Sequence, residues 1–261
     1  MTKEKRMRKS SEIYMLDEIC EIIRNGEYVV FFGGAGVSTD SGIPDFRGMG
    51  GLYSEEEEDG AYLMSVDCLQ SEPERFFSFY RNHIFHPYAE PGDAHIALAE
   101  LEQEGILKAV ITQNVDGLHQ RAGSRRVIEL HGTGEHCYCV KCGRTYQKER
   151  LNDTVDIPRC EKCNGMIRPD ITLYGESPDG SMLTEAEEEI AMADVLIVGG
   201  TSLSVNPAAS LVAGFMGEHL IIINDSPTEY DGLAEYMICA SLAEVLGAIV
   251  REIQDGSFMS D

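Results

Sequence analysis

The stretch YVVFFGGAGVSTDSGIPDFRG, residues 28–48, decides the fold class. Its apolar start, 28–32, predicts a short buried strand that runs into a glycine-rich turn. A strand followed by such a turn brings backbone N–H groups close to a pyrophosphate. The dinucleotide-binding pattern GxGxxG is incomplete, because Gly34 and Gly36 fit it whereas Thr39 replaces the third glycine. The turn then continues into PDFRG, whose aromatic and arginine a plain dinucleotide-binding turn does not need.

Other apolar runs along the chain predict a parallel sheet. Strands are expected at 108–112, 126–130, 194–200, 220–224 and 237–240, and helices at 12–25, 71–85, 94–104, 182–193, 207–217 and 242–253. Strands that alternate with helices are typical of a parallel sheet covered on both faces. We therefore predict an α/β fold with a Rossmann-like sheet, in which a large domain comprises about 12–132 and 176–255.

The segment 133–175 interrupts this alternation and carries five of the eight cysteines. Two CxxC pairs, Cys139 with Cys142 and Cys160 with Cys163, are separated by 17 residues. That spacing favours a tetrahedral zinc site made of four thiolates. Four thiolates leave the metal no open position for water, so the zinc is expected to be structural.

Other interpretations of the cysteines remain open on the sequence alone. The pairs could form a disulfide or redox-active CxxC motifs, and Cys137 could compete as a zinc ligand. The zinc interpretation predicts a small inserted zinc-ribbon module at about 133–175. Part of 49–90 is expected to be helical and to pack beside this module.

Composition and charge restrict the class of protein. The chain has 261 residues, of which 43% are hydrophobic and 25% charged, as in ordinary globular proteins. No apolar run approaches the roughly 18 residues of a membrane span, and the basic N-terminus lacks the apolar stretch of a signal peptide. We therefore expect a cytoplasmic protein that does not contact membranes. A formal net charge of −24 repels nucleic acid and would attract basic partners such as lysine-rich peptides; the alternative is that it serves only to keep the protein in solution.

Polar residues follow the ends of several predicted strands. They are Gln113, Asn114 and Asp116 after the second strand, His131 after the third, Thr201 and Ser202 after the fourth, and Asn224 and Asp225 after the fifth. Taken singly, Asn and Asp are also ordinary helix caps, and a lone histidine is more often structural. Ligands of open α/β sheets bind at the carboxyl ends of strands, so the convergence of these residues predicts a binding site.

The motifs taken together resemble one family. GAGVSTDSGIPDFRG, TQNVDGLHQRAG, ELHG, the two CxxC pairs and GTSLSVNPAA occur in this order. This combination resembles the sirtuins, which are NAD-dependent protein lysine deacylases. The segments AH at 94–95, RPDITLYGE at 168–176 and IIIND at 221–225 also look like family segments. The resemblance extends over roughly residues 12–252.

The resemblance implies a set of NAD-binding residues. Ala35, Thr39 and Arg47 match positions near the phosphates, and Phe46 matches an aromatic that shields the reactive ribose. Gln113 and His131 match positions that flank the nicotinamide ribose, and Ile43, Asn114, Val115 and Asp116 match the pocket for the carboxamide. Thr201, Ser202, Asn224, Asp225 and Ala240 match the adenosine end. The tail PDFRG is thereby explained, because the family cuts NAD as a co-substrate.

The resemblance also implies a reaction, with His131 and Asn114 as catalytic residues. The acyl oxygen of lysine attacks the ribose C1′ as nicotinamide leaves, and His131 then acts as general base through the ribose hydroxyls. The products are lysine, nicotinamide and O-acetyl-ADP-ribose. The substrate would bind as an added strand near Gly175 and Glu176 and near 203–206.

An acetyl group is the expected acyl group. Sirtuins that remove succinyl groups bind the acidic acyl group with a tyrosine and an arginine three residues apart after the cofactor loop. Between 49 and 88 no tyrosine of this chain has an arginine three residues on, so the resemblance does not imply a clamp for acidic acyl groups. Thr172, where the family usually has a bulkier apolar residue, would make the acyl tunnel slightly more polar. The alternatives are removal of other apolar acyl groups, ADP-ribosyl transfer or NAD hydrolysis, sensing of NAD without turnover, and a zinc-ribbon protein that binds nucleic acid.

Overall fold

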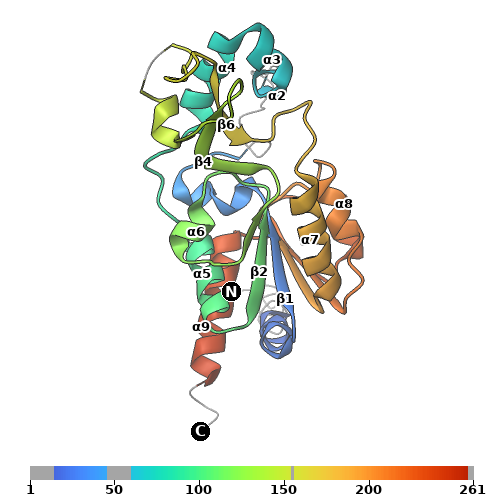
Figure 1. Cartoon of the computed structure of the whole chain (residues 1–261). Helices are drawn as coiled ribbons and strands as arrows, with labels where there is room; N and C mark the ends of the chain where they lie inside the picture. The colour runs from blue at the N-terminus through green and yellow to red at the C-terminus, as the bar shows by residue number, and fades with distance from the viewer. Residues whose placement is uncertain (1–14, 46–59, 154–155, 258–261) are drawn as a thin grey trace, which may run out of the picture.

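The computed structural model describes residues 15–45, 60–153 and 156–257 (Figure 1). Within them, a six-stranded parallel sheet has the order β3-β2-β1-β7-β8-β9. Its strands are β1 (Val29–Gly33), β2 (Leu107–Thr112), β3 (Val127–Glu129), β7 (Val195–Gly199), β8 (His219–Ile223) and β9 (Tyr236–Ile238). All six were expected from the sequence, and the α/β prediction is confirmed. The strand order reverses between β1 and β7, which is where doubly wound sheets bind ligands.

Helices cover both faces of the sheet (Figure 1). The helix at 15–25, α5 (Asp93–Gln103) and α9 (Leu242–Ser257) pack on one face, and α7 (Gly180–Met192) and α8 (Ala208–Ala213) pack on the other. Successive β1 side chains alternate between the two cores, since Phe31 lies in the first and Phe32 in the second. Among the described residues, no helix has the length and apolar character needed to cross a membrane.

A smaller lobe lies beyond the carboxyl ends of the strands (Figure 1). Its antiparallel sheet has the order β5-β4-β6, formed by β4 (Gly132–Cys139), β5 (Thr145–Gln147) and β6 (Ile167–Ile171). A third hydrophobic core joins this sheet to α2 (Gly60–Leu63), α3 (Val66–Ser71) and α4 (Pro73–Phe79). The remaining short elements are η1 (Ala35–Val37), η2 (Thr39–Ser41), η3 (Tyr80–Ile84), η4 (Lys148–Leu151), η5 (Asp231–Leu233) and α6 (Leu118–Ala122).

Two helix predictions need correction. The helix expected at 71–85 is divided, because α3 ends at Ser71, α4 starts at Pro73 and a π-helix follows from Tyr80. Glu72 has φ −136° and ψ 55°, outside the helical region, as expected of a residue before proline. The helix expected at 207–217 ends at Ala213 and is capped by Gly214.

Candidate functional site

The loops after β1 and β7 touch at the point where the strand order reverses. The Gly36 N–H donates to the Gly200 carbonyl at 2.8 Å. A Cβ on Gly36 would lie 2.7 Å from the Gly200 Cα, so only glycine permits this approach. Gly200 itself has φ +60°, which glycine adopts without strain. The contact fixes η1 and η2, which contain Ala35 and Thr39, against the start of the loop that contains Thr201 and Ser202.

Gln113 connects the ends of four strands. Its backbone N–H donates to the Gly33 carbonyl at the end of β1, at 3.0 Å. Its side-chain Nε2 donates to Thr201 Oγ1 after β7, at 2.9 Å. Its carbonyl oxygen lies 3.0 Å from His131 Nδ1, just after β3. The structure therefore brings together three of the predicted site residues, Gln113, His131 and Thr201.

The partner of His131 determines its tautomer. A carbonyl oxygen only accepts, so Nδ1 carries the proton and Nε2 keeps its lone pair. Burial lowers the pKa of His131, and the hydrogen bond to Gln113 opposes this only in part. The side chain is therefore neutral at pH 7, with one nitrogen able to accept a proton.

Ser38 holds the polar residues that follow β2. Its hydroxyl donates to Asp116 Oδ2 at 2.6 Å and accepts from Asn114 Nδ2 at 3.0 Å. His95 Nε2 lies 3.4 Å from the same hydroxyl, and His95 Nδ1 accepts the Gly92 N–H at 3.2 Å. The proton of His95 is therefore on Nε2, pointing at Ser38. The Ser38 hydroxyl thus holds the side chains of Asn114 and Asp116 in fixed orientations.

Sequence reasoning did not identify this support. Ser38 and His95 are both buried. In the sequence, Ser38 lies within a motif whose other residues match the NAD-binding positions more specifically, and His95 lies in the short segment AH. His119 is also buried, and its ring centroid lies 4.8 Å from that of His95. Burial lowers the pKa of His119 to about 3, so its ring stays neutral. The only available signals were the segment AH and the histidine inside the motif after β2.

The remaining candidates lie around the same edge. Val115 accepts the Gly134 N–H at 2.7 Å and packs on the core of the small lobe. Beyond the reversal point, Asn224 Nδ2 donates to the Ser226 carbonyl at 2.8 Å. The backbone carbonyl of Asp225 accepts from Cys239 Sγ, and the Ser202 hydroxyl pairs with that of Ser204. Ala240 packs on the first core, and the Ile43 N–H donates to the Ser38 carbonyl. Phe46 and Arg47 lie outside the described residues.

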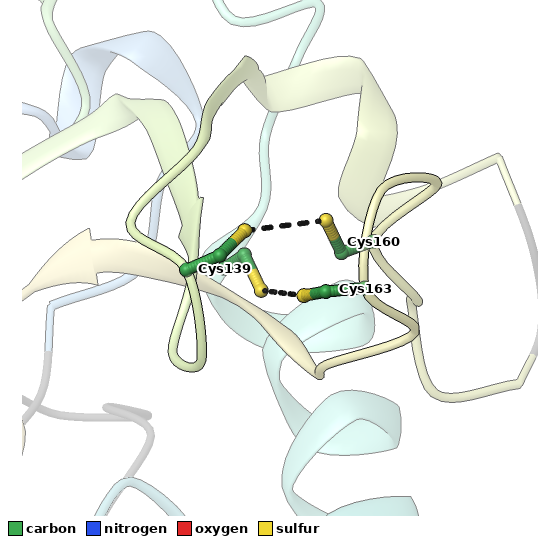
Figure 2. A group of neighbouring side chains, drawn as sticks. Cys139, Cys160 and Cys163 are labelled. Atoms are coloured by element: carbon green, nitrogen blue, oxygen red, sulfur yellow. Dashed lines mark hydrogen bonds between the residues drawn. The ribbon is translucent and has the colours of Figure 1, made fainter.

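The two CxxC pairs meet in the small lobe. The sulfurs of Cys139, Cys142, Cys160 and Cys163 all lie within 4.8 Å of one another, and Figure 2 shows those of Cys139, Cys160 and Cys163 turned toward a common centre. The Cys139–Cys163 and Cys142–Cys160 sulfur separations, 3.4 and 3.7 Å, are close to the roughly 3.8 Å that zinc bound at about 2.3 Å would give. None of the eight cysteines forms a disulfide in the structure, so the four-sulfur cluster favours the zinc interpretation over the disulfide one.

The surroundings of the four sulfurs also suit a structural zinc. The Tyr146 hydroxyl donates to Cys160 Sγ at 3.1 Å, and this bond is the main reason that the pKa of Cys160 falls to about 6. Cys137 points elsewhere, because its sulfur donates to the Gln147 carbonyl at 3.2 Å. The cluster therefore fits a four-thiolate structural zinc without Cys137.

Comparison with known proteins agrees with this geometry. The profile of the Sir2 family matches residues 34–207. An NAD-dependent protein deacetylase of Clostridium perfringens is 46% identical over 239 residues, covering 90% of this chain and 98% of that protein. A Sir2 variant with a deacetylated p53 peptide and 3'-O-acetyl ADP-ribose superposes with a TM-score of 0.84, at 39% identity over 91% of this chain and 98% of that one. Sir2 with a p53 peptide and NAD+ gives 0.81, at 38% identity over 94% and 99% of the two chains. The chain belongs to the Sir2 family, the sirtuins.

Proposed function

We propose that this protein is an NAD-dependent protein lysine deacetylase. The single observation that carries the proposal is His131, whose Nδ1 is committed to Gln113 and whose neutral Nε2 is left to accept a proton at the ligand-binding edge. NAD is the co-substrate, and the acetyl group is transferred to its ADP-ribose part. The products are deacetylated lysine, nicotinamide and O-acetyl-ADP-ribose.

The site residues take the following proposed roles. His131 is the general base, and Asn114 orients the nicotinamide end together with Val115 and Asp116. Gln113 positions His131 and contacts the nicotinamide ribose. Ala35, Thr39, Phe46 and Arg47 bind the phosphates and shield the ribose, and Thr201, Ser202, Asn224, Asp225 and Ala240 bind the adenosine end. The hydrogen bonds of Ser38 to Asn114 and Asp116 support this assignment, because they pre-orient both side chains.

The proposal assigns NAD binding to the large lobe and zinc binding to the small one. Residues of about 12–132 and 176–255 would form the NAD-binding domain, and about 133–175 with part of 49–90 the zinc-binding module. The first two cores draw on the larger set and the third on the smaller. The acetyl-lysine peptide would bind as a strand near Gly175 and Glu176 and near 203–206. A cytoplasmic location is proposed because eight cysteines without a disulfide suit a reducing compartment.

The rate of deacetylation is expected to fall in acid. His131 acts as a base only when neutral, and its pKa lies below the usual value of about 6.5. As the pH falls through this lowered pKa, Nε2 gains a proton and kcat/KM for the acetyl peptide drops. The pH–rate profile should therefore be flat between pH 7 and 8 and show its acid limb below pH about 6.5. An acid limb centred above pH 7 would contradict the assignment of His131.

Acyl preference tests the proposed substrate class. One peptide sequence carrying acetyl-, succinyl- or myristoyl-lysine is incubated with NAD, and loss of each acyl group is followed by mass spectrometry. Acetyl is expected to be removed at least about tenfold faster than succinyl, since a chain with net charge −24 does not favour an acidic acyl group. A preference for succinyl would overturn the assignment as a deacetylase.

A further inference from the structure

An ion pair between a buried arginine and a half-buried glutamate joins β6 to the segment that follows it. Arg168 lies on β6, is 5% exposed, and donates two hydrogen bonds to the Glu176 carboxylate, at 2.5 and 2.8 Å. A third bond runs from Arg168 Nη2 to the Ile171 carbonyl, at 2.7 Å, and the guanidinium lies 5.7 Å from the Tyr138 ring. The hydrogen bonds from Arg168 are the main reason that the pKa of Glu176 lies below its usual value.

The pair closes a tight turn at 173–176. Glu176 Oε2 also accepts the Leu173 N–H at 2.9 Å, and the Glu176 N–H donates to the Leu173 carbonyl at 3.0 Å. Gly175, inside the turn, has φ +90°, a conformation that suits glycine. The carboxylate of Glu176 therefore fixes the backbone of the turn from its inner side.

One edge of this turn is already occupied. The Val66 N–H donates to the Tyr174 carbonyl at 3.0 Å, and the Tyr174 N–H donates to the Met64 carbonyl at 3.1 Å. In contrast, no described residue makes a hydrogen bond with the backbone of Gly175. The turn thus presents an open stretch of backbone that an added strand could pair with.

The same segment is tied to the catalytic histidine. The Thr172 N–H donates to the His131 carbonyl at 2.8 Å, one residue before the turn begins. The segment 168–176 therefore begins and ends at the ion pair. Between its two ends it contacts the His131 backbone through Thr172 and presents the open backbone of Gly175. Any movement of the turn changes the distance between a strand bound there and His131.

We propose that Arg168 and Glu176 are positioning residues that hold the 173–176 turn in register for the acyl-lysine peptide. The inference rests on the proposed function, because the bound strand is the substrate of that reaction. An ion pair with one buried and one half-buried partner contributes little net stability compared with apolar residues of similar size, but its directed bonds fix one geometry. The bidentate fork of arginine is suited to that role.

Three variants test the positioning role against a matched control. Glu176→Gln keeps an acceptor for Leu173 but loses the charge, Glu176→Ala loses both, and Arg168→Met with Glu176→Gln removes both charges. The control, Glu72→Gln, makes the same change in an exposed pair with Arg75 in the same lobe. Each variant is compared with wild type for affinity toward a fluorescent acetyl-lysine peptide, for KM of peptide and of NAD, and for melting temperature.

The expected result separates positioning from stability. Peptide Kd and KM should rise about tenfold in Glu176→Ala and less in Glu176→Gln, with kcat and the KM of NAD within about twofold of wild type. The double variant should melt near wild type, because no buried charge is left unpaired, yet keep the raised peptide KM. The control should match wild type.

Two other outcomes overturn the proposal for different reasons. If the variants lower the melting temperature but bind the peptide as wild type does, the pair is structural and does not position the turn. If wild type itself binds no acetyl-lysine peptide and releases no nicotinamide, the proposed function fails, and this inference fails with it.

Discussion

Replacement of His131 by alanine is expected to reduce deacetylation about 10³-fold, within the range for loss of a positioned general base. The change removes the neutral Nε2 of His131, which is the proton acceptor. It leaves Gln113 in place, because Gln113 keeps its hydrogen bonds to Gly33 and Thr201. Nicotinamide release in the presence of peptide should persist at a measurable rate, since the base acts after that step. The measurement is a parallel assay of nicotinamide and of deacetylated peptide.

The control for this variant is His219→Ala. His219 lies at the start of β8, at the end of the sheet away from the site, and its half-buried ring pairs with Glu235. The His219→Ala variant should deacetylate the peptide at the wild-type rate. Both variants should keep the wild-type melting temperature and zinc content. Normal turnover by the His131 variant would show that the base has been misassigned.

Replacement of Cys160 by serine is expected to release zinc and unfold the small lobe. Cys160 belongs both to the four-sulfur cluster and to the third core, so the loss of one ligand also disturbs the packing against α4. Structural zinc contributes folding free energy directly. A loss of a few kcal/mol corresponds to a fall in melting temperature of about 10 °C for a chain of this size. Zinc content by mass spectrometry and thermal unfolding measure the two effects.

Cys137→Ser is the matched control for the zinc prediction. Cys137 is buried in the same lobe, two residues from Cys139, but its sulfur donates to a backbone carbonyl. A serine hydroxyl can make the same bond, so zinc should stay bound. If Cys137→Ser lost the metal while Cys160→Ser kept it, the ligand set would be wrong.

The sequence predicted the sheet better than the rest of the fold, and the reasons are local. The six strands of the main sheet are continuous apolar runs bounded by glycines and polar residues, so each is visible in isolation. The division of the helix at Glu72 depends on a single pre-proline residue within an otherwise helical pattern. The strands β4, β5 and β6 carry no such apolar run, because their lobe is held by its cysteines and a small core.

In the candidate site, too, the residues with a local sequence signal could be predicted and those that depend on contacts between distant segments could not. Residues that stand at strand ends, such as His131 and Gln113, could be proposed because parallel strands end at one edge. Ser38 and His95 could not, because their importance lies in contacts between segments 57 residues apart in the chain. Arg168 and Glu176 were part of a motif, but only the structure reveals that their side chains meet.

The deacetylase activity is tested by measuring nicotinamide release from NAD with and without an acetyl-lysine peptide while mass spectrometry follows the peptide. We expect release to require the peptide and to equal the loss of acetyl groups one for one, with O-acetyl-ADP-ribose as the third product. Release that continues without peptide, or peptide-dependent release with the acetyl group still on the lysine, would contradict the assignment as a deacetylase.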